Sequence, residues 1–208
     1  MSGFRALVPV VVWHDLLRSA ERADFKVNEK LLYEGAPGTF LLALQTGRVA
    51  VLSSARLIAL RGPGDLLGEM AAQDGRARSA TVTALEPCVA YKIHAAPFKR
   101  LLDRHHVGNV LNEYVLAKFR QSLAFAATRS ERPLWRTADL FVRLVELADP
   151  QHPDPHLIPM SQALLARSFE LSRRVVVQAV GELRERGLLS DTNPIRVADV
   201  EGLRRLAS

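Results

Sequence analysis

The stretch S-Q-A-L-L-A-R-S-F-E-L-S-R-R-V-V-V-Q-A-V-G-E-L-R-E-R-G, residues 161–187, decides the fold of the C-terminal part of the chain. Ser161 and Ser172 each precede an apolar-periodic run, and a serine there caps a helix because its hydroxyl accepts from the first free backbone N–H groups. The two helices are expected to end near Arg167 and Arg186. Two short helices joined so briefly form a helix-turn-helix.

The second of these helices has one apolar stripe at spacings i, i+3, i+4 and i+7, which predicts its buried face: Val176, Ala179, Val180 and Leu183. At about 100° per residue, the opposite face carries Arg174, Val177, Gln178 and Gly181. Arginine pairs with guanine and glutamine with adenine in the major groove, and a helix start offers N–H donors to phosphate. We therefore expect a DNA-binding face made of Ser161, Gln162, Ser172, Arg173, Arg174, Val177 and Gln178. The alternative is an ordinary solvated surface.

The segments around this motif complete a winged domain. Residues 168–171 are expected to form the break, with Glu170 where glycine is common; a left-handed backbone there costs a non-glycine residue about 1 kcal/mol. Residues 188–197 are expected to form a hairpin, the wing, with its turn at 191–194. Asp199 begins a last helix through Leu206. Upstream, the sequence predicts a polar hinge at Thr128–Pro133, a helix at Leu134–Ala148 and a proline-rich loop at Asp149–Pro159.

The N-terminal half has short apolar stretches separated by glycines, a pattern typical of an antiparallel roll or barrel. The expected strands are Leu31–Tyr33, Phe40–Leu44, Arg48–Leu52, Leu57–Leu60, Ser79–Leu85 and Val89–Ile93. Arg78 to Thr83 alternates and is rich in β-branched residues, so a half-buried strand is expected to begin at Arg78.

A long segment without proline or internal glycine, Asn109–Ala127, predicts a helix of almost 30 Å. One stripe of it suits pairing with a second copy of the helix: Val110, Tyr114, Ala117, Gln121 and Ala124. Another stripe is expected to cover the β-rich domain: Leu111, Val115, Phe119 and Leu123. The alternative is a single amphipathic helix that packs only on its own core.

Composition excludes several classes of protein. The 208 residues are 48% hydrophobic and carry a formal net charge of +6, as expected of a folded protein with a modest preference for polyanions. The single cysteine, Cys88, permits neither an internal disulfide nor a cysteine-ligated cluster. No metal site is expected, since the adjacent His105 and His106 would diverge on a helix. The apolar run Ala6–Trp13 is too short to span a bilayer, so a cytoplasmic protein without a membrane partner is expected.

The segment G-P-G-D-L-L-G-E-M-A-A-Q-D-G-R-A-R-S-A-T-V-T-A, residues 62–84, gathers groups suited to an anionic ligand. Arg78 and the backbone N–H of Met70 or Ala71 are expected to hold a phosphate, while Glu69 accepts from a sugar hydroxyl. The alternative is a structural ion pair between Glu69 and Arg78 that closes the loop.

With these motifs in order, the chain resembles the Crp/Fnr superfamily of bacterial transcription regulators across nearly all its length. The resemblance rests on the glycine-punctuated roll, the G-E…R-S-A loop, the long helix, the hinge and the S-R at the recognition helix. It implies an α+β fold with three parts. These are an N-terminal antiparallel β-roll like that of cyclic nucleotide-binding domains (1–106), a dimerisation helix (107–128) and a winged helix-turn-helix DNA-binding domain (129–208).

The resemblance also implies ligand residues. In the branch that binds cyclic AMP, the loop and strand positions match Gly68, Glu69, Arg78 and Ser79, and a further arginine on the long helix matches Arg120. Two hydroxyl residues that meet the adenine in that branch fall here on Ala124 and Phe125, which carry no hydroxyl. The expected effector site is therefore Gly68, Glu69, Met70, Arg78, Ser79, Arg120 and Ala124.

The function expected is that of a homodimer that binds double-stranded DNA under allosteric control by cyclic AMP or a related cyclic nucleotide, and that contacts RNA polymerase. No other cofactor is expected to be required. The alternative is a regulator of the same family that binds no nucleotide and is constitutive or responds to another effector. An enzyme is not expected, because no nucleophile, P-loop or metal motif accompanies Glu69 and Arg78. A haem sensor through Cys88 and His94, and a pure interaction protein, are the remaining alternatives.

Overall fold

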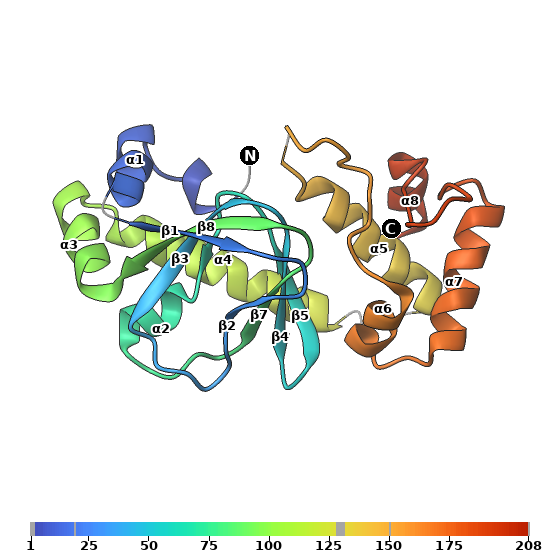
Figure 1. Ribbon diagram of the computed structural model, residues 1–208, viewed down its shortest axis with the longest axis horizontal. Coiled ribbons are helices and arrows are strands. Elements are labelled where there is room, and N and C mark those ends of the chain that lie inside the picture. Colours follow the sequence, from blue (N-terminus) through green and yellow to red (C-terminus); the bar gives the residue numbers. More distant parts are fainter. Residues whose placement is uncertain (1–2, 19, 128–131, 150, 208) are drawn as a thin grey trace.

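The computed structural model describes residues 3–18, 20–127, 132–149 and 151–207. Two four-stranded antiparallel sheets form the β-roll, as expected (Figure 1). The first sheet has the order β1-β8-β3-β6, with β1 Glu21–Phe25, β8 Cys88–His94, β3 Phe40–Thr46 and β6 Leu66–Leu67. The second has the order β2-β7-β4-β5, with β2 Lys30–Leu32, β7 Thr81–Ala84, β4 Val49–Ser53 and β5 Arg56–Arg61.

Helices flank the roll and form most of the C-terminal domain (Figure 1). Helices α1 (Val10–Arg18) and α3 (Ala95–His105) lie at one end of the molecule, a 3-10 turn η1 (Phe4–Ala6) precedes α1, and α2 (Glu69–Asp74) follows β6. The long α4 (Gly108–Ala127) runs along the roll towards the C-terminal domain, which contains α5 (Pro133–Glu146), α6 (Gln162–Phe169), α7 (Arg173–Glu185) and α8 (Val200–Leu206). No helix in the described ranges is both long and apolar enough to cross a membrane.

Several expected boundaries are wrong by a few residues. The strand expected from Arg78 begins only at Thr81, because Arg78 pairs through its backbone with Gly35 and Ala36 outside β7. Helix α6 continues through Phe169, so the turn between α6 and α7 is shorter than expected. In the described part of the chain the wing is reduced to a bridge between Leu189 and Val197, with backbone bonds from the Ser190 N–H to the Arg196 carbonyl (3.0 Å) and from the Ala198 N–H to the Leu188 carbonyl (2.9 Å). Most of the expected hinge, residues 128–131, lies outside the described residues.

The expected faces of α4 are confirmed only in part. Tyr114, expected on the pairing stripe, is buried in its own chain, where its ring meets Phe4 edge-on. Phe119 and Leu123, expected against the β-rich domain, are 52% and 55% exposed. Leu111, expected on the stripe that covers the roll, is buried as predicted, together with Tyr114 and Phe125, whereas Leu116, Phe119 and Leu123 form an exposed stripe. Both stripes follow helical spacing, so periodicity alone did not distinguish them.

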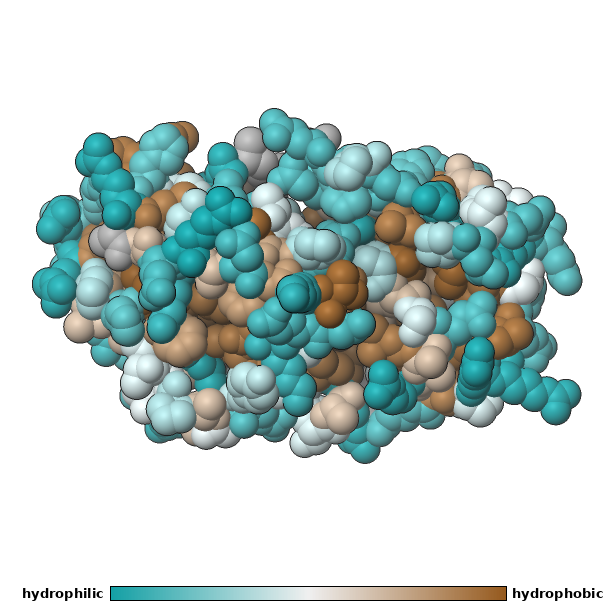
Figure 2. Space-filling view, in the orientation of Figure 1, coloured by the Kyte–Doolittle hydropathy of each residue, from teal (hydrophilic) through white to brown (hydrophobic). Residues whose placement is uncertain are grey.

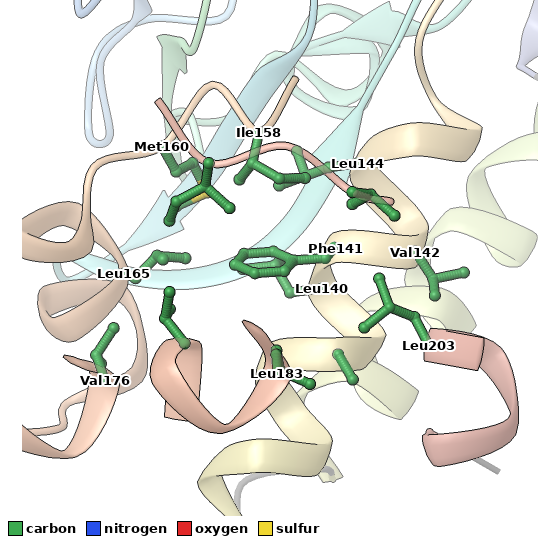
Figure 3. Packing of buried hydrophobic residues seen from close by; sticks show 14 of the residues in the cluster. Leu140, Phe141, Val142, Leu144, Ile158, Met160, Leu165, Val176, Leu183 and Leu203 are labelled. Carbon is green, nitrogen blue, oxygen red and sulfur yellow. The ribbon is translucent and has the colours of Figure 1, made fainter. Parts of the chain in front are cut away.

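The core of the C-terminal domain is continuous with the second sheet of the roll. Phe141 of α5 lies at the centre of a cluster with residues of α6, α7, α8 and the segment at Ile158–Met160 (Figure 3). Leu57 and Leu60 of β5 and Phe125 of α4 belong to the same cluster. On the face seen in Figure 2, hydrophobic residues gather in the middle and over the C-terminal domain, inside a hydrophilic rim.

A buried ion pair of the roll, Arg48 with Glu86, also contacts the C-terminal domain. Arg48 is fully buried, and its Nε and Nη2 donate to the two carboxylate oxygens of Glu86 at 3.0 and 2.6 Å. The Arg48 Nη1 donates to the carbonyl oxygen of Leu144 in α5 at 2.9 Å. His152, in the loop after α5, lies 3.2 Å from the same Glu86 carboxylate. Arg48 therefore connects the roll to the C-terminal end of α5.

Candidate functional site

A cavity of about 410 Å³ lies between the 68–79 segment of the roll and α4. Five of the seven residues expected in an effector site line it: Gly68, Glu69, Met70, Arg78 and Ser79. The remaining walls come mainly from β2, β4, β5, β6, β7 and α4, so the cavity is assembled from distant parts of the chain.

Gly68 lies at a position of the cavity wall that has no room for a side chain. It precedes α2 with a left-handed backbone, φ 74° and ψ 18°, which a side chain disfavours. A Cβ atom built on it would lie 2.1 Å from Nη1 of Arg78. Gly68 therefore permits both the turn into α2 and the close approach of the Arg78 guanidinium.

Arg78 is held by the main chain. Its Nη1 donates to the carbonyl of Gly68 at 2.7 Å, its Nη2 donates to the carbonyl of Phe40, and its guanidinium lies 4.8 Å from the centre of the Phe40 ring. Burial lowers the pKa of Arg78, and the charge of Glu69 opposes this shift. No ion pair within 4.0 Å joins Glu69 to Arg78 in the described part of the chain, so the expected alternative of a closing Glu69–Arg78 bridge is not what the structure contains.

Glu69 is a buried carboxyl in the first turn of α2. Burial raises its pKa, and the nearby charge of Asp65 adds to the rise, while its own backbone N–H and the charges of Arg61 and Lys118 lower it. A buried carboxyl at a helix start, near the cations Arg61 and Lys118, is suited to accept a hydrogen bond from a ligand hydroxyl.

The α4 wall differs from the expectation. Arg120 and Ala124 are exposed and do not line the cavity within this chain. The neighbouring residues Phe119 and Leu123 line it instead, because a shift of one residue turns a side chain by about 100° around a helix. The remaining lining residues of α4 are Val115, Lys118, Ser122 and Ala126.

The sequence analysis missed a buried network that fixes α4 to the floor of the cavity. Asp65 is fully buried and accepts from Tyr114 Oη at 3.0 Å and from the Gly62 N–H at 3.0 Å. Lys118 Nζ lies 2.7 Å from the same carboxylate. Burial and the Asp65 charge raise the pKa of Tyr114 well above its usual value, so its hydroxyl stays protonated. Asp65 is separated from Tyr114 by 49 residues, and no local pattern signals such a contact.

The predicted DNA-binding face is exposed in the structure. Ser161 accepts from the N–H of Leu164 at 3.2 Å and Ser172 from that of Val175 at 3.3 Å, so both expected caps are confirmed. The four residues predicted for the buried stripe of α7 are all buried. The opposite side of α7, at the outer edge of the molecule (Figure 1), exposes Arg173, Arg174, Val177 and Gln178, while Gln162 at the start of α6 is half-buried.

The turn before α7 and the wing after it are both anchored. Glu170 has the expected left-handed backbone, φ 56°, and its carboxylate pairs with Arg56 of the roll at 2.5 Å. Arg184 of α7 donates to the carbonyls of Ser190 and Thr192 and to the side chain of Asn193, at 3.0–3.2 Å. These hydrogen bonds hold the wing beside α7.

Two family models match separate parts of the chain. The model described as a cyclic nucleotide-binding domain matches residues 22–105, and the model described as a Crp-like helix-turn-helix domain matches residues 136–206. A two-domain protein of this order is a transcription regulator with an effector domain and a DNA-binding domain. The chain belongs to the Crp/Fnr family of transcription regulators.

The matches to curated relatives cover less than half of the chain. The chain is 29% identical over 92 residues to a cAMP-dependent protein kinase regulatory subunit of Yarrowia lipolytica. This match covers 44% of this chain and 24% of that protein. It is 42% identical over 76 residues to the Pycsar effector protein PaPycTIR of Pseudomonas aeruginosa, which covers 36% of this chain and 25% of that protein. The chain thus spans about a quarter of the length of these relatives.

Solved structures resemble the whole chain. FixK2 from Bradyrhizobium japonicum matches with a TM-score of 0.75 at 16% identity, over 91% of this chain and 98% of that one. A CRP-family transcriptional regulator from Thermus thermophilus, TTHB099, matches with a TM-score of 0.70 at 22% identity, over 89% and 96%. At these identities the similarity establishes the fold alone.

Proposed function

We propose that this regulator is a homodimer that reads DNA with α7 and is controlled by a cyclic nucleotide, cyclic AMP or a related one, in the cavity between the 68–79 segment and α4. The observation that carries the proposal is the convergence of Gly68, Glu69, Arg78 and Ser79 on one cavity whose other wall is α4. Such a regulator acts in the cytoplasm and contacts RNA polymerase.

Pairing through α4 is supported by its exposed apolar stripe. Leu116, Phe119 and Leu123 are 48%, 52% and 55% exposed, at spacings of three and four residues that suit a coiled pair of helices. Three large apolar side chains in one row on a surface indicate an interface. Arg120 and Ala124 lie exposed beside this stripe, and in a paired molecule they would face the partner's α4.

Recognition of a cyclic phosphate is supported by the donors at the start of α2. The first N–H groups of that helix are free of helical partners, and Ser79 adds a hydroxyl. A phosphate would replace the carbonyls of Gly68 and Phe40 as the partner of Arg78, which exchanges neutral acceptors for a charged one. Glu69 would accept from a ribose hydroxyl.

DNA reading is supported by the exposed ends of two helices. Arg174 and Gln178 lie one turn apart on the outer side of α7, a spacing that suits adjacent base pairs of the major groove. The two recognition helices of a dimer would meet half-sites about 34 Å apart.

The ligand half of the proposal is tested by titration calorimetry of the full chain with cyclic AMP. We expect binding by the wild type and by Arg76→Gln, because Arg76 is exposed and does not line the cavity. Arg78→Gln is expected to weaken binding about 10-fold or more, since charged hydrogen bonds contribute about 1.5–3 kcal/mol. Equal affinities in all three proteins would contradict the proposed site.

The DNA half is tested by fluorescence anisotropy with a selected operator, with and without cyclic AMP, and by the mass of the particle in solution. Tighter operator binding by a dimer in the presence of the nucleotide supports the proposal. A monomer that binds no duplex would contradict it.

The alternative, a regulator of the same family that binds no nucleotide, is favoured by one observation. The Arg78 guanidinium is already bonded to two carbonyls and stacked on Phe40, so it is stabilised without a ligand. Under this alternative the calorimeter shows no heat with cyclic AMP, and the operator affinity is the same with and without it.

A further inference from the structure

The cavity has two chemically different ends along α4. Its 68–79 wall lies by the beginning of α4, where Gln73 of α2 donates to Asn112 at 3.3 Å. Its other end lies by β4 and β5, which pack on α4 around Phe125. If the phosphate binds at the first end, as proposed above, the base of a nucleotide extends towards the second.

The second end is lined by large apolar side chains. Val51 and Ile58 come from the β4–β5 hairpin, and Val115, Phe119 and Leu123 come from α4. None of these side chains can donate or accept a hydrogen bond. They can enclose a flat ring system and exclude water from it, and the Phe119 ring offers a face on which any base can stack.

The polar groups at this end are engaged elsewhere. Ser53 Oγ donates to the Glu34 carboxylate at 3.3 Å, and Ser122 Oγ donates to the backbone carbonyl of Lys118 at 3.0 Å. The Lys118 ammonium is paired with the buried Asp65. The hydroxyl protons of Ser53 and Ser122 are therefore committed to partners within the protein.

Arg61 also lines the cavity. Its Nη1 donates to the carbonyl of Leu60 at 2.8 Å. Its further N–H groups can only donate, and adenine and guanine both present ring nitrogens that accept. A second copy of α4 would add the same apolar stripe, with Arg120, another residue that only donates, beside it.

We propose that the base of the nucleotide is held in this end mainly by apolar contact and stacking, with Arg61 donating to either purine, so that the cavity binds adenine and guanine cyclic nucleotides with similar affinity. This inference rests on the proposed nucleotide function and specifies its ligand class as both purine cyclic nucleotides. The reason is that strong discrimination requires a buried polar group that the wrong ligand leaves unpaired, and apolar walls discriminate weakly.

The experiment is titration calorimetry of the full chain with cyclic AMP and with cyclic GMP under the same conditions. We expect dissociation constants within about 10-fold of each other. Phe119→Ala is expected to weaken both ligands by the same factor, about 5-fold to 150-fold, because stacking does not depend on the identity of the base.

Leu123→Thr supplies the converse variant, since it places a hydroxyl in the apolar wall. We expect it to change the ratio of the two affinities, because a hydroxyl can hydrogen-bond to one base edge better than to the other. Leu7→Thr is the matched control: it makes the same exchange at an exposed leucine that lies outside α4 and does not line the cavity, and we expect the wild-type ratio.

The outcomes separate this inference from the proposed function. Preference of the wild type for one purine by more than about 30-fold overturns the inference and leaves the nucleotide function standing. A ratio that Phe119→Ala changes also overturns it. Binding of neither nucleotide overturns the nucleotide function itself and the inference together.

Discussion

The recognition face of α7 and the cavity beside α4 differ in how they are built. The α7 face comes from one helix, and its side chains point to solvent, so it can meet DNA without giving up internal contacts. The cavity is assembled from β2, β4, β5, β7, the 68–79 segment and α4, and its charged groups are already bonded within the protein. The first site is therefore ready to bind, whereas the second must exchange partners.

This difference is what makes the cavity suitable for control. A ligand shifts an equilibrium only as far as its affinity differs between two arrangements. Replacing the Gly68 and Phe40 carbonyls around Arg78 changes contacts near α2, and the Asp65–Lys118 pair and Tyr114 connect the adjacent floor to α4. The β4–β5 hairpin lines the same cavity and reaches the turn of the helix-turn-helix through Arg56 and Glu170.

The largest expected effect comes from breaking the buried connection between the two regions. Arg48→Ala leaves Glu86 buried without its partner and frees the Leu144 carbonyl, so the free energy of unfolding is expected to fall by about 3–5 kcal/mol. Urea denaturation followed by circular dichroism measures this loss.

Arg56→Ala is the matched control, because it removes the exposed interdomain pair with Glu170. Exposed pairs contribute about 0–1 kcal/mol, so a much smaller loss is expected. Similar losses in the two variants would show that the domains are not held together mainly by the buried pair.

The second effect concerns the cavity itself. Gly68→Ala places a Cβ 2.1 Å from Arg78 Nη1, and we expect nucleotide affinity to fall about 10-fold to 100-fold, since overpacking costs about 1–3 kcal/mol. Gly75→Ala, at the other end of α2, has the same left-handed backbone but nothing within 4 Å of its Cβ. It should lose about 1 kcal/mol of stability and keep its nucleotide affinity. Equal affinities in calorimetry would contradict a role for the Gly68 turn.

The comparison of the two regions also explains what the sequence could predict. Val176, Ala179, Val180 and Leu183 were predicted as the buried stripe of α7, and the structure confirms it, because one apolar stripe on a short amphipathic helix leaves a single solution. The caps at Ser161 and Ser172 were likewise local, since the hydroxyl and the N–H that it accepts from are three residues apart.

The cavity was only half predictable, for a physical reason. The 68–79 wall lies in one continuous segment, so its residues were found together. The α4 wall depends on which of two apolar stripes faces the roll, and Phe119 and Leu123 are as apolar as the residues that are buried. Arg120 and Ala124 each follow one of these residues in the sequence, and within this chain they do not line the cavity. Arg48 and Leu144 are separated by 96 residues, and no local sequence pattern predicts the hydrogen bond between them.

The third effect concerns the recognition face. Arg174→Ala and Gln178→Ala should each cost about 1–3 kcal/mol in binding to the preferred operator and little on other sequences, because they remove contacts to base edges. Both residues are exposed, so folding and the dimer should be unaffected. Glu185→Gln, exposed near the end of α7, is the control and should keep the preference. Fluorescence anisotropy on matched and mismatched duplexes measures the ratio; loss of the dimer in either alanine variant would mean that the faces of α7 are assigned wrongly.

The smallest expected effect is a change in how stability depends on pH. Burial raises the pKa of Glu69 above the ordinary value of 4.5, so the folded state holds this proton more tightly than the unfolded chain does. Ionised Glu69 therefore costs stability at neutral pH, and that cost disappears as the pH falls through the raised pKa towards 4.5. Glu69→Gln should raise the thermal midpoint at about pH 7–8 relative to the wild type, with the difference shrinking towards pH 4.5. A difference in thermal midpoint that stays constant across this pH range would mean that ionised Glu69 does not destabilise the fold. The cavity would then not differ from the exposed α7 face in carrying a buried carboxyl that costs stability.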